Sequence, residues 1–139
     1  MRSLLLAVAA FLLMIVPAGA STVTVRVSKS EQLMRVYVGE RQVYSWKVST
    51  GAKGYKTPLG SYSVKRMHTM WRSRKYNDAP MPHALFFTGG WAVHGTTSVR
   101  QLGRPASHGC VRLHPENART LFGIVSSYGR DNTRIVVTN

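Results

Sequence analysis

The segment Thr22–Ser28 reads TVTVRVS and decides the character of the fold. Val23, Val25 and Val27 recur at every second residue, which places their side chains on one face of a β-strand. A strand with one apolar face must bury that face against another layer of the domain. The segment therefore predicts the first strand of a mainly β domain.

Further segments with a period of two follow this strand. Gly39-Glu40 connects two of them and is typical of a two-residue β-hairpin. The stretch Thr50–Lys56 (TGAKGYK) is rich in turn residues and predicts a loop. The expected strands cover residues 22–28, 33–38, 41–49, 61–66, 84–87, 91–94 and 134–138.

One helix is predicted late in the sequence. Pro115 suits a first helical turn, Glu116 lies near the positive end of the helix dipole, and Gly129 is a typical stop signal. Apolar residues recur at helical spacing at Ala118, Leu121, Phe122 and Val125. We therefore expect a mainly β, antiparallel sandwich or barrel that carries at least one helix.

Residues 67–83 (MHTMWRSRKYNDAPMPH) follow neither period. A connection of this length without its own secondary structure is usually either disordered or a functional lid. We expect a lid whose apolar contacts come from Met67, Met70, Trp71, Tyr76 and Met81.

Length and composition restrict the possible functions. The 139 residues suffice for one domain, and 19 Lys and Arg against 5 Asp and Glu give a net charge of +14. The single cysteine excludes an intramolecular disulfide and a four-cysteine zinc site. The scarcity of carboxylates disfavours a glycosidase that works with two of them.

The first twenty residues have the pattern of a secretory signal peptide. Arg2 precedes an apolar run over residues 4–17, and Ala18-Gly19-Ala20 offers a cleavage site of small residues. We expect a signal peptide over 1–20, a domain over 21–139, and export to the periplasm or cell wall. The alternative is a retained membrane anchor, although the run is short for a span of roughly 20 residues.

Reactive side chains concentrate between His94 and Arg112. An imidazole that accepts the thiol proton would make Cys110 an efficient nucleophile. The N–H groups of His108, Gly109 and Cys110 could point at one oxyanion. Because acidic residues are scarce here, a backbone carbonyl such as that of Gly95 is the better partner for the base.

Two other interpretations of these residues stay open at this point. Cys110 could be a packing residue and His94 an ordinary hydrogen-bonded histidine. Alternatively, His94, His108, Cys110 and His114 could bind zinc, although their spacing matches no common zinc-finger pattern.

Several motifs, in this order, resemble the L,D-transpeptidase catalytic domain family (YkuD type, ErfK/YbiS-like). The resemblance covers roughly residues 22–137 and describes a single-domain member. Its motifs are TPLG at 57–60, MP at 81–82, FFTGGWAVHG at 86–95, SHGCVRL at 107–113 and NARTLF at 117–122.

The resemblance implies a mainly β fold and acyl transfer on peptidoglycan stem peptides. Cys110 would attack the carbonyl between the third residue, often meso-diaminopimelate, and the terminal D-Ala. An amine of another stem peptide, or of a protein, would then accept the acyl group. His94 would be the proton donor and acceptor, held by the Gly95 carbonyl, and His108 would support the oxyanion.

The resemblance also sets expectations for binding. Arg112 would shape the site or meet a carboxylate, and Ser107 would hold the loop by hydrogen bonds. No metal, cofactor, nucleic acid or membrane span after signal cleavage is expected. The expected substrate-binding residues are Ser107, Gly109, Arg112, Trp71, Tyr76 and Met81.

Three rival functions remain. A hydrolase with the same nucleophile would pass the acyl group to water. A wall-binding module would bind without turnover. A nucleic-acid-binding protein would use the basic and aromatic residues of 66–76, since such patches suit single strands.

Overall fold

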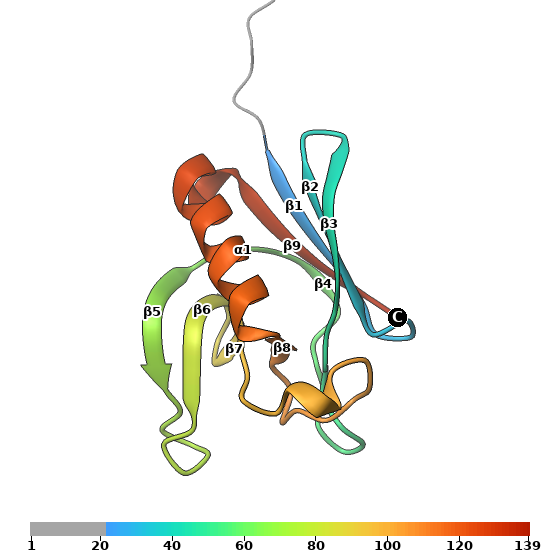
Figure 1. Cartoon of the computed structure of the whole chain (residues 1–139), viewed down its shortest axis with the longest axis vertical. Coiled ribbons are helices and arrows are strands. Elements are labelled where there is room, and N and C mark those ends of the chain that lie inside the picture. The colour runs from blue at the N-terminus through green and yellow to red at the C-terminus, as the bar shows by residue number, and fades with distance from the viewer. Residues whose placement is uncertain (1–21) are drawn as a thin grey trace, which may run out of the picture.

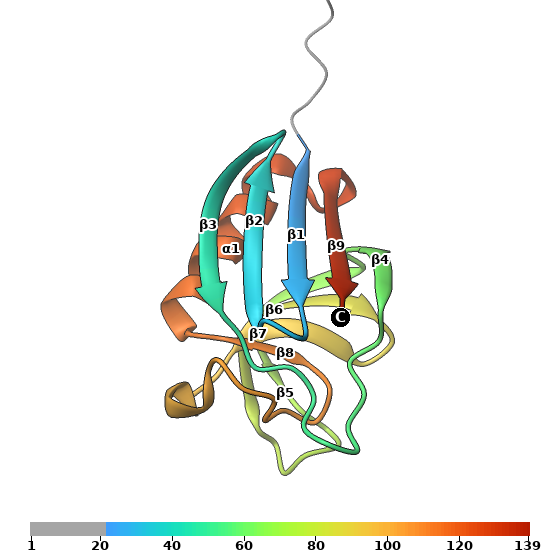
Figure 2. The same cartoon turned by 90° about the vertical axis from the view of Figure 1, so that its right-hand side faces the viewer.

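The structure is a computed structural model that describes residues 22–139. The expected signal peptide over 1–20 lies outside the described residues. Nine strands form two sheets, and one long helix, α1 (Pro115–Tyr128), lies behind the first sheet in Figure 2. The fold class is therefore the predicted one, a mainly β domain with a helix late in the chain.

The first sheet is built around the valine-rich strand. Its order is β3-β2-β1-β9-β4, and β1 and β9 run parallel while the other neighbours run antiparallel. The five strands lie side by side in Figure 2. They are β1 (Val23–Ser28), β2 (Leu33–Val38), β3 (Arg41–Lys47), β4 (Gly60–Ser63) and β9 (Thr133–Thr138).

The second sheet carries the reactive residues. Its order is β5-β6-β7-β8, and only β7 and β8 run parallel within it. Two short 3-10 helices, η1 (Val99–Gln101) and η2 (Arg130–Asn132), complete the described elements. The strands are β5 (Arg66–Arg72), β6 (Pro80–Thr88), β7 (Trp91–Gly95) and β8 (Val111–Leu113).

The core lies between the inner face of the first sheet, the second sheet and α1 (Figure 1). Val23, Val25 and Val27 are fully buried there, as their period predicted. Burial of one such side chain is worth roughly 1.5–3 kcal/mol. The helix contributes Leu121 and Val125 to the same cluster and contacts β6 and β7, so it holds the second sheet from behind.

The ends of α1 follow the predicted signals. Pro115 occupies the first turn, and the imidazole of His114 accepts the Glu116 N–H at 3.2 Å. Gly129 ends the helix with a φ of 93° and donates its N–H to the Val125 carbonyl at 2.8 Å.

The prediction of one strand over residues 61–66 is wrong, because the two ends of this segment belong to strands in different sheets. The chain leaves the first sheet after Ser63 and enters the second at Arg66, with Val64 buried in the core between them. A period of two reports which face a residue occupies, but it cannot report a change of sheet.

The expected lid over 67–83 is also corrected. These residues form most of the hairpin β5–β6, and only residues 73–79 connect the two strands. Pro80 and Pro82 lie in β6 although proline cannot donate a ladder hydrogen bond. At this end, however, β6 pairs with β5 alone, since β7 pairs with β6 only from Leu85 onward, and an edge tolerates proline.

No helix within residues 22–139 is long and apolar enough to cross a membrane.

Candidate active site

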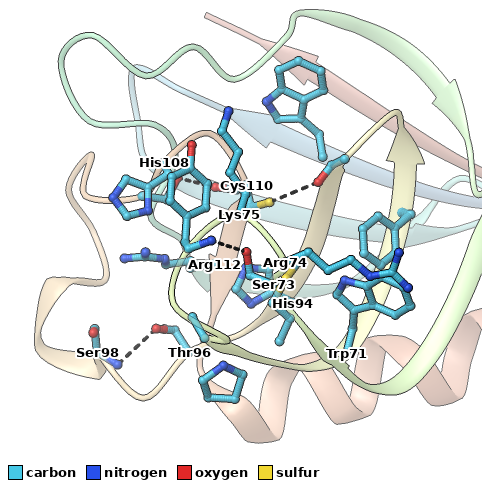
Figure 3. Close-up of a pocket in the computed structure, with 18 of the residues that line it drawn as sticks. Trp71, Ser73, Arg74, Lys75, His94, Thr96, Ser98, His108, Cys110 and Arg112 are labelled. Atoms are coloured by element: carbon cyan, nitrogen blue, oxygen red, sulfur yellow. Dashed lines mark hydrogen bonds between the residues drawn. The ribbon is translucent and has the colours of Figure 1, made fainter.

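Two parallel neighbouring strands place His94 and Cys110 in one cavity. His94 lies on β7, opposite Arg112 in the β7–β8 ladder, and Cys110 directly precedes β8. Both side chains line a cavity of about 700 Å³ (Figure 3). The strand pairing thus brings together residues that are sixteen positions apart in the sequence.

The imidazole of His94 is buried and has one fixed partner. Only 6% of the residue is exposed, and Nδ1 lies 2.7 Å from the carbonyl oxygen of Gly95. Because a carbonyl oxygen only accepts, Nδ1 carries the hydrogen and Nε2 keeps its lone pair. Burial lowers the pKa of His94 to about 4, the Gly95 bond opposes this shift, and the Arg112 charge adds to it.

Gly95 also sets how closely the surrounding elements approach. A Cβ at this position would lie 3.0 Å from Cγ of Pro82 and 3.1 Å from Cα of Pro115. A larger residue would therefore displace β6 or the start of α1. The glycine lets both elements close against the carbonyl that holds His94.

The sulfur of Cys110 lies against β7. The Ala92 N–H donates to Sγ at 3.4 Å, and the thiol donates to the Gly90 carbonyl at 3.8 Å (Figure 3). Burial raises the pKa of the thiol, while the Ala92 N–H and the Arg112 charge oppose that shift. Within residues 22–139, no hydrogen bond joins Sγ to His94. Burial of both groups favours the neutral thiol and the neutral imidazole.

Hydrogen bonds from two hydroxyl groups fix the loop that carries Cys110. Ser107 Oγ donates to the Cys110 carbonyl at 2.6 Å and accepts the Gly109 N–H at 3.0 Å. Thr57 Oγ1 donates to the Gly109 carbonyl at 2.7 Å and accepts the Gly51 N–H at 2.8 Å. Both hydroxyls are buried, so each tie is sheltered from competing water.

Gly109 is required by its conformation and by its neighbours. Its φ is 125°, and a Cβ would lie 2.8 Å from Nε1 of Trp91 and 3.0 Å from the Lys56 carbonyl oxygen. The Trp91 indole in turn donates to that Lys56 carbonyl at 3.1 Å. The loop is thus packed on the start of β7.

The backbone N–H groups of His108, Gly109 and Cys110, expected to stabilise an oxyanion, differ in whether they already have a hydrogen-bond acceptor. The Gly109 N–H already donates to Ser107 Oγ. Those of His108 and Cys110 have no hydrogen-bond acceptor in the part of the chain that the structure describes. Of the expected donors, these two remain available.

Arg112 is held beside the cavity by the protein itself. Its backbone pairs with Ser49 at 2.9 and 3.1 Å, and its guanidinium donates to the Ala106 carbonyl at 3.3 Å and to Oε1 of Gln101 at 3.5 Å. The cation is therefore in place to lower the thiol pKa without a direct bond to sulfur.

The tip of the β5–β6 hairpin contacts the cysteine loop. The rings of Tyr76 and His108 are stacked with centroids 4.1 Å apart, and Tyr55 meets His108 edge-on at 4.8 Å. Trp71, Tyr76 and Met81, for which substrate binding is predicted, line the cavity.

Two residues of the expected lid do not line the cavity. Met67 packs against the main core, and Met70 is 52% exposed on β5. Both lie on the strand that carries Trp71, but their side chains take no part in the cavity lining.

The alternative zinc set does not converge. No group of three or more His, Cys, Asp or Glu within residues 22–139 could hold a metal ion. His114 caps α1, and His108 stacks on Tyr76 and contacts Tyr55 edge-on.

Sequence reasoning missed several residues that build the site. Thr57 is one, since no local pattern reveals a hydrogen bond to a residue 52 positions away. Ala92 and Gly90 are others, because their backbone groups contact the sulfur. No local pattern indicates these contacts, because a period of two reports the faces of side chains and not the partners of backbone groups.

Together, these features describe a two-sheet β domain with a histidine–cysteine cavity on parallel strands. The sequence profile of the L,D-transpeptidase catalytic domain (YkuD) matches residues 22–137. The chain therefore belongs to this family.

Individual relatives agree with the assignment. A protein of Bacillus licheniformis carries the provisional name L,D-transpeptidase YkuD and is 24% identical to this chain over 121 residues. The match covers 82% of this chain and 64% of the relative. The chain thus spans less than two thirds of that relative.

Solved structures share the fold. An L,D-transpeptidase from Mycobacterium smegmatis superimposes with a TM-score of 0.76 at 24% identity, over 86% of this chain and 59% of that chain. An L,D-transpeptidase from Stackebrandtia nassauensis superimposes with a TM-score of 0.74 at 26% identity, over 85% of this chain and 56% of that chain. An L,D-transpeptidase from Xylanimonas cellulosilytica superimposes with a TM-score of 0.71 at 28% identity, over 88% of this chain and 63% of that chain.

Proposed function

We propose that this chain is an exported cysteine L,D-transpeptidase that acts on peptidoglycan stem peptides. The observation that carries the proposal is the shared cavity of Cys110 and His94, in which the Gly95 carbonyl takes Nδ1 and leaves Nε2 of His94 as a proton acceptor. Family membership supports the reaction class.

The first half-reaction forms a thioester. The Cys110 thiol turns from the Gly90 carbonyl toward His94 and gives its proton to Nε2 as sulfur attacks the carbonyl of the third stem residue. Because burial disfavours both the thiolate and the imidazolium, proton transfer accompanies attack rather than preceding it. The N–H groups of His108 and Cys110 stabilise the oxyanion.

The tetrahedral intermediate then collapses. The bond between the third residue and D-Ala breaks, and His94 returns its proton to the leaving amine, so that D-Ala departs neutral at nitrogen. The acyl group stays on Cys110 as a thioester. In the second half-reaction an acceptor amine attacks this carbonyl, His94 takes its proton, and the thiol is restored with a new amide bond.

The cavity favours an amine over water as the acceptor. Tyr76 and His108 stack across its rim, and the lining includes the apolar rings of Trp71 and Phe86. Exclusion of water slows hydrolysis of a reactive acyl intermediate. The acceptor is an amine of a second stem peptide, which gives a 3–3 cross-link, or an amine of a protein.

Mass spectrometry of the intact protein tests this proposal. After mixing with a disaccharide-tetrapeptide, we expect a mass gain equal to the donor without D-Ala, located on Cys110. Cys110→Ala should show no gain, whereas Arg41→Ala, an exposed change on β3, should acylate normally. An adduct on the alanine variant, or none on the folded parent protein, would contradict the mechanism.

Addition of an acceptor amine separates transfer from the hydrolase alternative. Transfer predicts that the adduct disappears with formation of a linked peptide. Hydrolysis predicts a free tripeptide whose yield does not depend on the amine.

Sequencing of the mature N-terminus after expression tests the expected export, because signal cleavage should leave Ser21 as the first residue.

A further inference from the structure

The charge along the cavity wall is one-sided. Four lining residues are cations, and none of the lining residues is an aspartate or glutamate. The one carboxylate of the hairpin, Asp78, is exposed and pairs with Arg72 at 3.6 Å, outside the cavity. The cations of the wall are Arg66, Arg74, Lys75 and Arg112.

Among the four cations of this wall, Arg66 is half-buried, and no hydrogen bond or ion pair within the described residues holds its guanidinium. Three arginines within residues 22–139 are half-buried, namely Arg35, Arg66 and Arg112. Arg35 pairs with a carboxylate at 2.7 Å, and Arg112 donates to a backbone carbonyl at 3.3 Å. The guanidinium of Arg66 instead meets only aromatic rings, with the centroid of Phe86 at 3.9 Å and that of Trp71 at 4.8 Å.

Stacking prepares this guanidinium for an anion. The guanidinium lies over two rings rather than against an oxygen, so its N–H donors have no hydrogen-bond acceptor within residues 22–139. Packing on two rings also restricts rotation of the side chain, so less conformational entropy is lost when an anion binds. A planar fork of this kind matches a carboxylate with two parallel hydrogen bonds.

A second guanidinium shares the same indole. The guanidinium of Arg74 lies 5.4 Å from the centroid of Trp71, and no oxygen partner within the described residues bonds to it. Figure 3 draws Trp71 and Arg74 around the cavity that also holds His94 and Cys110. Two cations on one ring repel each other, and a bound anion relieves this repulsion.

We propose that Arg66 and Arg74, held on Trp71, form a subsite for a free carboxylate of the donor peptide. The inference rests on the proposed function and deepens it. The carboxylate is the one on the side chain of the third residue, next to the bond that Cys110 attacks. The subsite thus selects donors in which this group is a carboxylate rather than a carboxamide, because an amide offers no negative charge and only one acceptor oxygen.

The test compares two donors that differ in this one group. Acylation of Cys110 is followed by intact mass without any acceptor, using tetrapeptides whose third-residue side chain ends in a free carboxylate or in its amide. We expect the parent protein to acylate about tenfold to hundredfold faster with the free acid, as the loss of a charge-assisted hydrogen bond implies.

Variants then assign the preference to residues. Arg66→Gln and Arg74→Gln should each slow acylation by the acid donor and leave the amide donor nearly unchanged, so that the ratio of the two rates falls. Arg74 is exposed, so its variant remains informative if Arg66→Gln fails to fold. Arg72→Gln is the matched control, because Arg72 lies on the same hairpin outside the cavity and should keep the parent ratio.

The outcomes separate the two proposals. Equal rates with both donors, or a ratio that neither arginine variant changes, would overturn the carboxylate subsite and leave the transpeptidase function intact. Absence of acylation with both donors would overturn the function and, with it, the subsite.

Discussion

The loop at 105–113 and the hairpin at 66–82 face the same cavity, but they are held in different ways. Hydrogen bonds from Thr57 and Ser107 fix the loop, and both hydroxyls are buried. The hairpin presents its cations to the cavity on aromatic rings, and its tip is mostly exposed.

This difference suggests a division of work. The atoms that react must be placed within tenths of an ångström, which short hydrogen bonds between distant segments achieve. Recognition of a substrate group tolerates looser contacts. Substitutions in the loop should therefore change the rate with every donor, and substitutions in the hairpin should change which donor is preferred.

The largest expected effect is loss of the thiol. Iodoacetamide should label one equivalent of protein, since Cys110 is the only cysteine, and full labelling should abolish acylation. Because burial raises the thiol pKa, the labelling rate should keep rising into the alkaline range instead of reaching a plateau near neutral pH. Continued turnover after complete labelling would remove Cys110 from the reaction.

His94→Ala should slow acylation by about 10²–10⁴-fold, the usual contribution of a general base. Acylation by the acid donor and by the amide donor should slow equally, because the imidazole is not part of the proposed carboxylate subsite. Rapid-quench mass spectrometry of the first turnover measures the rate. His108→Ala is the control, since the His108 ring stacks on Tyr76 and meets Tyr55 edge-on; a larger loss in that variant would make His108 the base.

Thr57→Val should weaken both stability and rate. The change keeps the shape of the side chain but leaves the Gly109 carbonyl and the Gly51 N–H buried without partners, at about 1–3 kcal/mol for each group. Urea unfolding measures the loss in free energy, and Thr69→Val, on the exposed side of β5, is the control. The donor ratio should stay unchanged; a changed ratio would mean that the loop also selects substrates.

The smallest expected effect is the pH dependence of stability due to His94. Its pKa is lowered from 6.5 to about 4 in the folded state, so the unfolded chain binds more protons between these values. Stability is therefore fully present above pH 6.5 and is lost as pH falls toward 4, with a slope on the order of 1.4 kcal/mol per pH unit. Urea midpoints of the parent and His94→Gln should diverge in this window; parallel curves would contradict the buried neutral imidazole.

The sequence predicted the parts of the fold that depend on local periodicity. Val23, Val25 and Val27 are buried on one face, and α1 begins and ends where its signals indicated. Pro80 and Pro82 hid the hairpin, because proline marks an edge strand and a loop in the same way. The crossing between sheets at Val64 also left no local signal.

Sequence reasoning for the site was limited in the same manner. The motif around Cys110 and the His94-Gly95 pair were visible because each is short. The contributions of Thr57 and of the Ala92 N–H depend on contacts between segments far apart in the chain. The Arg66–Trp71 contact was hidden because the two residues are five positions apart on β5, and strict alternation would place them on opposite faces.

The position of β9 has a consequence for synthesis of the protein. Residues 133–138 lie between β1 and β4, so β4 can join the sheet that starts with Val23 only after the ribosome has made these residues. A nascent polypeptide that already contains His94 and Cys110 still lacks the strand that connects β4 to β1. The first sheet, which shares the hydrophobic core with the second, should therefore be completed only after both reactive side chains have been synthesised.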